Sequence, residues 1–227
     1  MYDELKYWYL RDHKLFWTLS MSQIKQLCII TGFKKATKGE IIYFSASDLP
    51  RIYLLKKGNI KIVSVDDEGN ETIKEILQKG DLFGELSLES DNNVNEYAKV
   101  LTEEVSICSF LMSDFETLIL KNPDLALSYT KFVGLKMKRL KNSYSNLVSK
   151  DAKTRLITFL SEWAQKEGIF EGNKVVLDNY LTQSDIAQII CTSRQTATQL
   201  LNEFEIKGLI YYNRKQITIA DITKLVA

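Results

Sequence analysis

The sequence predicts an α+β protein, with an antiparallel β-roll first, one long helix next, and a small helical domain with a β-hairpin last. Three observations predict this class. Short β-rich runs separated by glycine turns fill residues 38–111 with no helical pattern between them. Apolar residues then recur at alternating steps of four and three from Val133 to Leu147, and Ala126 extends the pattern upstream. Finally, two short amphipathic helices and two strands around a polar turn fit residues 181–219.

Length and composition predict more than one domain. The chain has 227 residues, 45% of them apolar, and a formal net charge of +1. That length and apolar content suffice for two cores. A nearly neutral chain binds nucleic acid only through locally placed charge. Residues 121–148 hold such charge, with six Lys and Arg residues against one Asp.

Cysteine spacing and apolar runs exclude several classes of protein. Cys28, Cys108 and Cys191 lie far apart without C-x-x-C spacing, which predicts reduced, mostly buried thiols and no disulfide framework or metal site. No apolar run approaches the roughly 20 residues that cross a membrane, and the charged, aromatic N-terminal segment is unlike a signal peptide. We expect a cytoplasmic protein with no membrane partner, metal or cofactor.

Residues 1–30 predict helical pieces, one of them capped by Ser20. We expect the aromatic side chains of Trp8, Phe16 and Trp17 to pack against the following domain rather than bind a ligand.

Six runs in the β-rich region have the composition of strands. Glycine turns such as Lys57-Gly58 and Lys79-Gly80 separate them. Closely spaced strands without intervening helices predict an antiparallel sandwich or barrel. The runs are Ile41–Phe44, Ile52–Leu55, Ile60–Val65, Thr72–Leu77, Ala98–Leu101 and Val105–Leu111.

A short helix is expected at Ser113–Leu120, and a long one begins at Asn122-Pro123. The long helix carries a heptad seam. The seam either packs on the β domain or forms a parallel dimer contact, and its regularity favours the dimer. The predicted dimer residues are Val133, Met137, Leu140, Tyr144 and Leu147. A further helix is expected at Ala152–Lys166, with Asp151 as its cap.

A helix-turn-helix pattern fills the C-terminal segment. Thr182, with Asp185 three residues later, has the form of a capping box, and Ser193 caps a second helix. Gly208 ends that helix in a left-handed conformation. Two strands, 209–212 and 216–219, then complete a winged helix-turn-helix.

The outward face of the second helix carries side chains suited to DNA. Arg forms a bidentate fork with guanine, Gln pairs with adenine, and hydroxyl groups bind phosphates. The alternative is an ordinary helical hairpin with a polar solvent face, which spacing alone does not exclude. The candidate DNA-binding residues are Thr182, Ser184, Ser193, Arg194, Gln195, Thr196, Thr198 and Gln199, with Arg214 and Lys215 in the hairpin turn.

These motifs resemble those of the Crp/Fnr family of bacterial transcription regulators. The matching segments are Thr182/Asp185/Ile186/Ala187, Ser193-Arg194-Gln195-Thr196 and Lys207-Gly208-Leu209-Ile210. Upstream, the phrases KGEII, LLKKGNIKI, DEGNE and KGDLFGELSL are similar, in that order, to the family's cyclic-nucleotide-binding jelly roll. The resemblance implies an effector-sensing β-roll at 1–120, a dimerisation helix at 121–149 and a winged helix-turn-helix at 150–227. The implied partners are double-stranded DNA with a near-palindromic operator, a second copy of the chain, and RNA polymerase.

The chain departs from the family pattern where cyclic AMP would bind. The family's phosphate-binding Arg-Ser is absent, and Glu96 occupies or adjoins the Arg position; a carboxylate repels a phosphate in a confined pocket. We therefore predict no tight cyclic-AMP binding, an unidentified effector, and a structural turn at Gly84-Glu85. The candidate effector residues are Gly84, Glu85, Leu86, Asn95, Glu96, Tyr97, Leu140 and Lys141.

Other sensory chemistries lack their residues. The family's iron–sulfur branch needs four thiolates, and only Cys28 lies in the N-terminal segment. A haem needs an axial ligand, and the single histidine, His13, is expected at the surface.

The DNA face also differs from that of the cyclic-AMP-dependent members. Arg194, Gln195 and Gln199 stand where those members carry Arg, Glu and Arg, so Arg194 is expected to keep a guanine contact while the remaining bases differ. Cys191 replaces the usual turn glycine, and Asp151 and Arg155 resemble the family's hinge-helix pair.

Two other function classes differ from a DNA-binding regulator in the residues that they need. An enzyme is not supported, because the chain has one His and no motif for a nucleophile or metal. A ligand-sensing adaptor that acts through protein partners without DNA stays open. Steep salt dependence of DNA binding would separate a DNA-binding protein from that adaptor.

Overall fold

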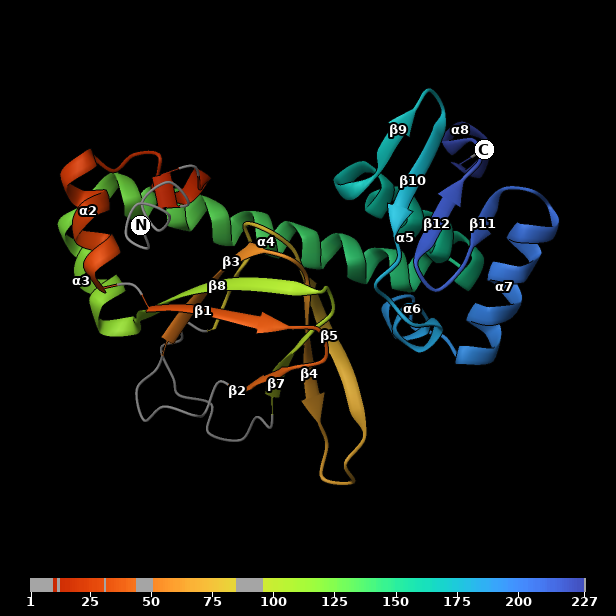
Figure 1. Ribbon diagram of the computed structural model, residues 1–227, viewed down its shortest axis with the longest axis horizontal. Coiled ribbons are helices and arrows are strands. Elements are labelled where there is room, and N and C mark those ends of the chain that lie inside the picture. The colour runs from red at the N-terminus through yellow and green to blue at the C-terminus, as the bar shows by residue number, and fades with distance from the viewer. Residues whose placement is uncertain (1–9, 12, 31, 44–50, 85–95, 227) are drawn as a thin grey trace. The chain divides into compact units, whose positions relative to one another are not determined.

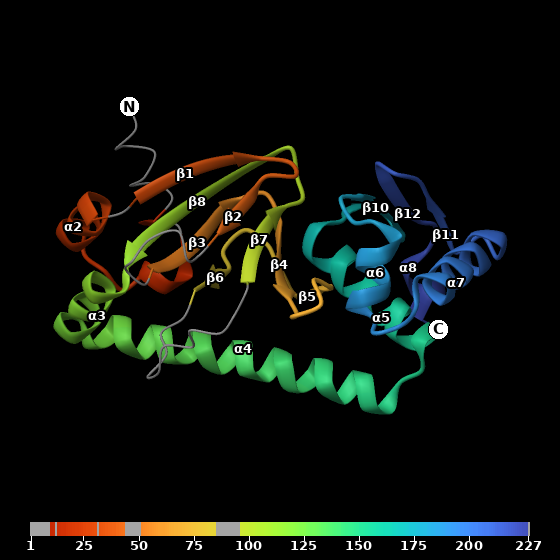
Figure 2. The ribbon, with the colours of Figure 1, turned by 90° about the horizontal axis from the view of Figure 1, so that it is seen from below.

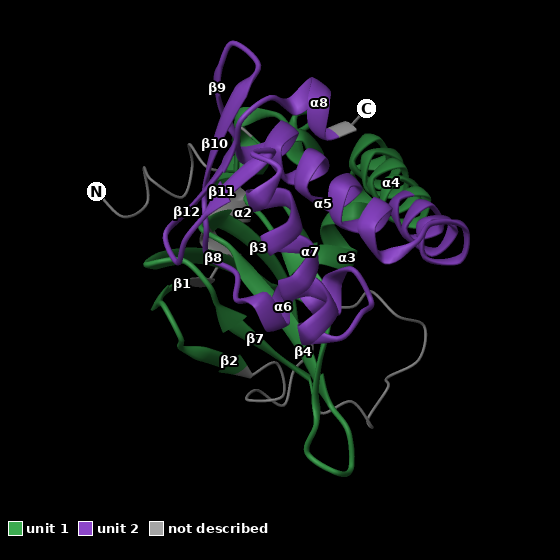
Figure 3. Cartoon of the chain, turned by 90° about the vertical axis from the view of Figure 1, so that its right-hand side faces the viewer, with its two compact units in different colours: residues 1–138 green, residues 139–227 purple. Residues whose placement is uncertain are grey.

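The computed structural model divides into two compact units, residues 1–138 and 139–227 (Figure 3). The boundary lies inside the longest helix, α4 (Pro123–Ser149) (Figure 1). Within the described part of the chain, no helix is long and apolar enough to cross a membrane. The structure describes residues 10–11, 13–30, 32–43, 51–84 and 96–226.

Two four-stranded antiparallel sheets form most of the first unit. Their strand orders are β1-β8-β3-β6 and β2-β7-β4-β5, and Figure 2 shows β1, β8 and β3 side by side. This arrangement confirms the predicted antiparallel β domain. The strands are β1 (Gly32–Thr37), β2 (Ile41–Tyr43), β3 (Arg51–Lys57), β4 (Ile60–Val65), β5 (Glu71–Leu77), β6 (Leu82–Phe83), β7 (Glu96–Val100) and β8 (Glu104–Leu111).

Two of these strands gave no recognisable signal in the sequence. Strand β6 has only two residues, and β1 carries adjacent exposed lysines, Lys34 and Lys35. Strand β1 nevertheless pairs with β8 along its whole length, from Gly32 opposite Ser109 to Thr37 opposite Glu104. It lies at the edge of its sheet, where charged side chains stay solvated.

The N-terminal pieces are a 3-10 turn, η1 (Lys14–Phe16), and a helix, α2 (Met21–Ile30). Phe16 is buried in the core and its ring lies 6.2 Å from that of Phe110, as predicted. The prediction was wrong for Trp17, which is 65% exposed, because successive residues of a tight turn point to different sides. Trp8 lies outside the described residues.

His13 is not the surface residue that the sequence suggested. Its ring is half-buried, its Nε2 donates to the Gly80 carbonyl at 2.9 Å, and its Nδ1 accepts from the Leu15 amide at 3.2 Å. Burial lowers the pKa of His13, while the Gly80 hydrogen bond and the charge of Asp81 raise it by less. Both ring nitrogens therefore have backbone partners.

Helix α3 (Met112–Lys121) and the first turns of α4 close the core of this unit. Phe115 and Leu125 are fully buried, and Tyr129 meets Phe115 edge-on with ring centroids 5.5 Å apart. The side-chain amide of Asn122 donates to the Leu118 carbonyl at 2.7 Å and fixes the corner between the helices.

The second unit is a helical domain with one small sheet of order β11-β12-β10-β9. It confirms the predicted winged helix-turn-helix and adds the hairpin β9–β10, for which no strands were predicted. Besides the last turns of α4, the elements are α5 (Ala152–Glu167), β9 (Ile169–Glu171), β10 (Lys174–Asp178), α6 (Gln183–Ile189), α7 (Arg194–Ile206), β11 (Ile210–Tyr212), β12 (Gln216–Ile219) and α8 (Ile222–Val226).

Candidate nucleic-acid interface

Helix α6 begins at the predicted capping box. The Thr182 hydroxyl accepts from the Asp185 amide at 3.1 Å, and the Asp185 carboxylate accepts from the Thr182 amide at 2.8 Å. Ile186 and Ala187 are buried. The caps and the apolar side together fix where α6 starts and which face it turns inward.

Helix α7, which occupies the position of the recognition helix in a helix-turn-helix, also begins and ends as predicted. The Ser193 hydroxyl accepts from the Thr196 amide at 3.1 Å, and Gly208 follows the helix with φ +66°. Ala197, Leu201 and Phe204 are fully buried. The opposite face must therefore point outward.

Three predicted base-contacting side chains lie on that outward face. Arg194, Gln195 and Gln199 are all exposed, within the first two turns of the recognition helix. In helix-turn-helix proteins these first turns contact base edges in the major groove. The first turn of α7 holds no acidic residue, and the positive end of the helix dipole lies there. The arrangement suits an anionic ligand.

The predicted hydroxyl residues fall into two groups. Ser184 is exposed on α6, and its hydroxyl is available for a phosphate. Thr182 and Ser193 use their oxygens as helix caps, and Ser193 also lies 2.9 Å from the Thr196 hydroxyl. Thr198 is half-buried and bonds the Arg194 carbonyl at 2.8 Å.

Gln183 is a site residue that sequence reasoning missed. Its side-chain oxygen lies 3.0 Å from the Thr198 hydroxyl, and its side-chain nitrogen donates to the Tyr212 hydroxyl. It thereby connects α6, the recognition helix and β11, the first strand of the hairpin β11–β12 that forms the wing. An amide that bonds two residues far along the chain leaves no local pattern in a sequence.

The wing turn presents the two predicted basic residues. The Asn213 side chain accepts from the amides of Lys215 and Gln216 at 2.8 and 2.9 Å, and the Asn179 side chain donates to its carbonyl at 2.7 Å. These bonds hold a tight loop on which Arg214 and Lys215 are exposed.

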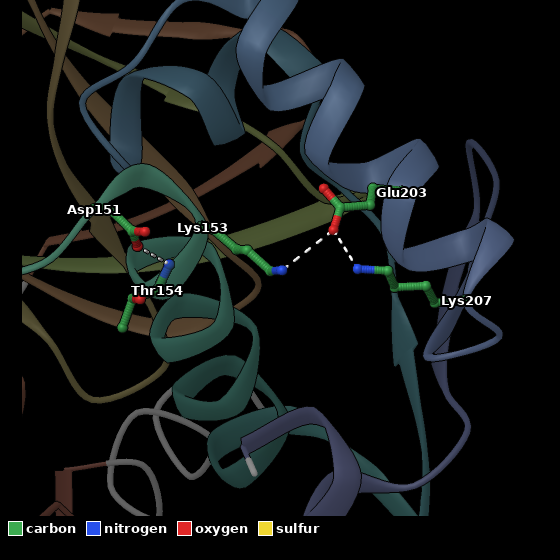
Figure 4. A network of polar contacts seen from close by, with 5 residues as sticks. All are labelled: Asp151, Lys153, Thr154, Glu203 and Lys207. Atoms are coloured by element: carbon green, nitrogen blue, oxygen red, sulfur yellow. Dashed lines mark hydrogen bonds and ion pairs between the residues drawn. The ribbon is translucent and has the colours of Figure 1, made fainter.

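The acidic residue Glu203 lies near the end of the recognition helix, where two lysines balance its negative charge. Its carboxylate bonds Lys207 at 2.5 Å and Lys153 of α5 at 3.2 Å (Figure 4). Hydrogen bonds from Lys207 and Lys153 lower its pKa.

Asp151 caps α5 as predicted. Its carboxylate accepts from the Thr154 amide at 2.7 Å (Figure 4), and hydrogen bonding to Thr154 lowers the pKa of Asp151.

The turn between α6 and α7 differs from the expectation for its cysteine. Cys191 is exposed, whereas the sequence suggested mostly buried thiols. The turn puts this side chain outside the two-helix core. Cys108 is buried in β8, and the Cys28 side chain lies outside the described residues.

The predicted effector residues are described only in part. Gly84 has φ +84°, and a Cβ there would collide with the Arg51 carbonyl oxygen. Glu96 forms an ion pair with Lys74, and Tyr97 is buried on β7. Glu85, Leu86 and Asn95 lie outside the described residues, and Leu140 and Lys141 are exposed on the part of α4 that belongs to the second unit.

The predicted dimer residues form an exposed apolar stripe on α4. A surface helix of a monomer seldom exposes so many apolar side chains along one line. The exposed fractions are Val133 42%, Met137 56%, Leu140 70%, Tyr144 69% and Leu147 43%.

Comparison with known proteins matches both units. Residues 154–227 match the family described as Crp-like helix-turn-helix domain, and residues 33–122 match the cyclic nucleotide-binding domain. A CRP-like cAMP-activated global transcriptional regulator of Mycobacterium tuberculosis is 27% identical over 188 residues, which cover 83% of this chain and 84% of the relative. A global nitrogen regulator of Nostoc sp. is 26% identical over 183 residues, 80% of this chain and 82% of the relative. The structure of a CooA mutant from Carboxydothermus hydrogenoformans matches with a TM-score of 0.70 and 25% identity over 88% of each chain.

Proposed function

We propose that this protein binds a near-palindromic operator as a homodimer. The premise is that the chain belongs to the Crp/Fnr family of DNA-binding, non-enzymatic transcription regulators. Each recognition helix would enter a major groove, and two-fold symmetry sets the half-sites about one helical turn apart. The observation that carries this proposal is the exposed set Arg194, Gln195 and Gln199 on the first turns of α7.

The chemistry of these three side chains supports a particular kind of half-site. The Arg194 guanidinium suits the O6 and N7 acceptors of guanine, and the amides of Gln195 and Gln199 suit adenine. Ser184, Arg214 and Lys215 would bind phosphates and hold the register without specifying bases.

The exposed α4 stripe supports the homodimer. Heptad spacing lets two parallel helices bury this stripe against each other. We assign dimerisation to residues 121–149, effector sensing to 1–120 and DNA binding to 150–227, with RNA polymerase as the partner on DNA.

The effector is proposed to be something other than cyclic AMP, although the Mycobacterium tuberculosis relative is described as cAMP-activated. The chain has no Arg-Ser in the stretch where the family binds the phosphate, and Glu96 there is an acid paired with Lys74. Gly84 has a steric reason to be glycine beside the Arg51 carbonyl. Calorimetry with cyclic AMP tests this, and saturable micromolar binding would refute it.

Selection of bound sites from a random DNA pool, followed by footprinting, tests the main proposal. We expect a two-fold symmetric footprint. The affinity of the protein for the selected DNA should fall steeply as the salt concentration rises, because each neutralised phosphate releases counterions. An adaptor that acts only through protein partners would select no site and show no footprint.

A further inference from the structure

The turn that leads into the recognition helix holds a backbone conformation its sequence disfavours. Cys191 has φ +49°, in the left-handed region where a Cβ crowds the following carbonyl. Among the described residues, no other non-glycine residue has a positive φ. Ser193 caps α7 two residues later. The conformation of Cys191 therefore determines the direction in which α7 leaves the turn.

Arg155 of α5 binds two backbone carbonyls of this turn. Its Nε donates to the Ile190 carbonyl at 2.7 Å, and its Nη2 donates to the Cys191 carbonyl at 3.2 Å. These carbonyls follow α6, where helical carbonyls lose their intrahelical partners. Hydrogen bonds from a charged donor are stronger than those from a neutral one. The guanidinium thus stabilises a turn that is strained with Cys191. A glycine at the same position would adopt this conformation without strain.

The same guanidinium also binds the start of the domain. Its Nη1 donates to the Lys150 carbonyl at 2.6 Å, one residue before the Asp151 cap of α5. One rigid fork therefore connects the segment that enters the domain with the turn that aims α7. A lysine ammonium cannot reproduce this planar set of donors.

We propose that Arg155 is a positioning residue for DNA recognition, whose fork holds the left-handed turn at Cys191 and fixes the direction in which α7 presents Arg194. The inference rests on the proposed role of α7 in DNA binding. It predicts that the need for Arg155 depends on residue 191: with glycine at that position, the turn holds its conformation without the fork.

The test is a double-mutant cycle of Arg155→Lys and Cys191→Gly. Arg155→Lys keeps the charge, so a change in affinity reflects the fork and not the loss of a phosphate-attracting group. Operator affinity is measured by fluorescence anisotropy, and hydrogen exchange of the Cys191 and Thr192 amides is measured in the protein without DNA. In the wild type these amides donate to the carbonyls of Gln188 and Ala187 at 3.0 and 2.9 Å.

We expect Arg155→Lys to weaken operator binding about tenfold and to speed exchange of both amides. Cys191→Gly in the Arg155→Lys background should restore both properties, and Cys191→Gly alone should bind as the wild type does. If Arg155→Lys in the cysteine background fails to fold, the glycine-background variant still decides: it must bind as tightly as Cys191→Gly alone.

Two results would overturn the proposal: wild-type affinity and exchange in Arg155→Lys, or a double variant as weak as Arg155→Lys. The second result would mean that Arg155 touches DNA or only supports the core. If the wild type bound no DNA site, the proposed function would fail instead, and amide exchange would still decide whether Arg155 holds the turn in a way that glycine replaces.

Discussion

The imidazole of His13 donates a hydrogen bond to the carbonyl of Gly80, which lies 67 residues further along the chain. This bond joins the N-terminal segment to the turn before β6. It requires the proton on Nε2 and a bare Nδ1, because Nδ1 accepts from the Leu15 amide.

Mild acid should weaken this contact. Burial lowers the pKa of His13 in the folded chain, so the unfolded chain takes up the proton first as pH falls. The contribution of His13 to the unfolding free energy is full above about pH 6.5 and is lost below it, toward the lower folded pKa. Urea unfolding at several pH values between about 5.5 and 7.5 measures this loss.

His13→Gln is the matched control, because a glutamine amide donates and accepts but does not titrate. The chain has no other histidine. The variant should show a flatter dependence on pH in this range; an equal slope in both proteins would contradict the assignment.

Arg194→Ala should weaken specific operator binding by about 1–3 kcal/mol and relax the preference for guanine at one position of each half-site. Lys166→Ala, which removes one charge from an exposed position on α5, serves as the control and should leave the selected sequence unchanged. Unaltered binding by Arg194→Ala in a titration on the selected operator would count against the proposed guanine contact.

Leu140→Glu should separate the proposed homodimer into monomers. The side chain is 70% exposed in the single chain, and both copies would lose its burial and gain facing charges, a cost of about 3 kcal/mol or more per dimer. Sedimentation at micromolar concentration should show monomer. Leu120 is 83% exposed on α3, outside the seam, and the matched variant Leu120→Glu should remain dimeric. Dimers of Leu140→Glu would show that the seam is not the contact.

Gly84→Ala should cost about 1–3 kcal/mol of unfolding free energy, because the added Cβ meets the Arg51 carbonyl. Gly39→Ala provides the comparison. Both glycines have φ +84°, but nothing lies within 4 Å of a Cβ at Gly39. The difference between the two variants isolates the collision, and equal losses would leave only the backbone conformation as the reason for glycine at residue 84.

The helix-turn-helix was predictable because its signals are local. Thr182 and Asp185 are three residues apart, and Gly208 follows directly on an apolar repeat, so capping and periodicity alone give the helix limits. The Arg155 contacts were not predictable, since they join a side chain to carbonyls 35 and 36 residues away. The residues around Cys191 do not themselves indicate a left-handed residue, and only the glycine usual in the family at this position does. The adjacent lysines of β1 do not have the composition of a strand, and only its pairing with β8 makes it one.

The charged edge of the first sheet has a consequence for self-association. Lys34 and Lys35 on β1 are exposed and pair with Glu40 and Glu104 at 3.5 and 3.2 Å. A strand from a neighbouring molecule would have to strip water from those lysines before it could hydrogen-bond alongside. Edge-to-edge growth of the sheet is thereby disfavoured, which leaves the exposed apolar side of α4 as the surface through which a second copy would bind in the proposed dimer.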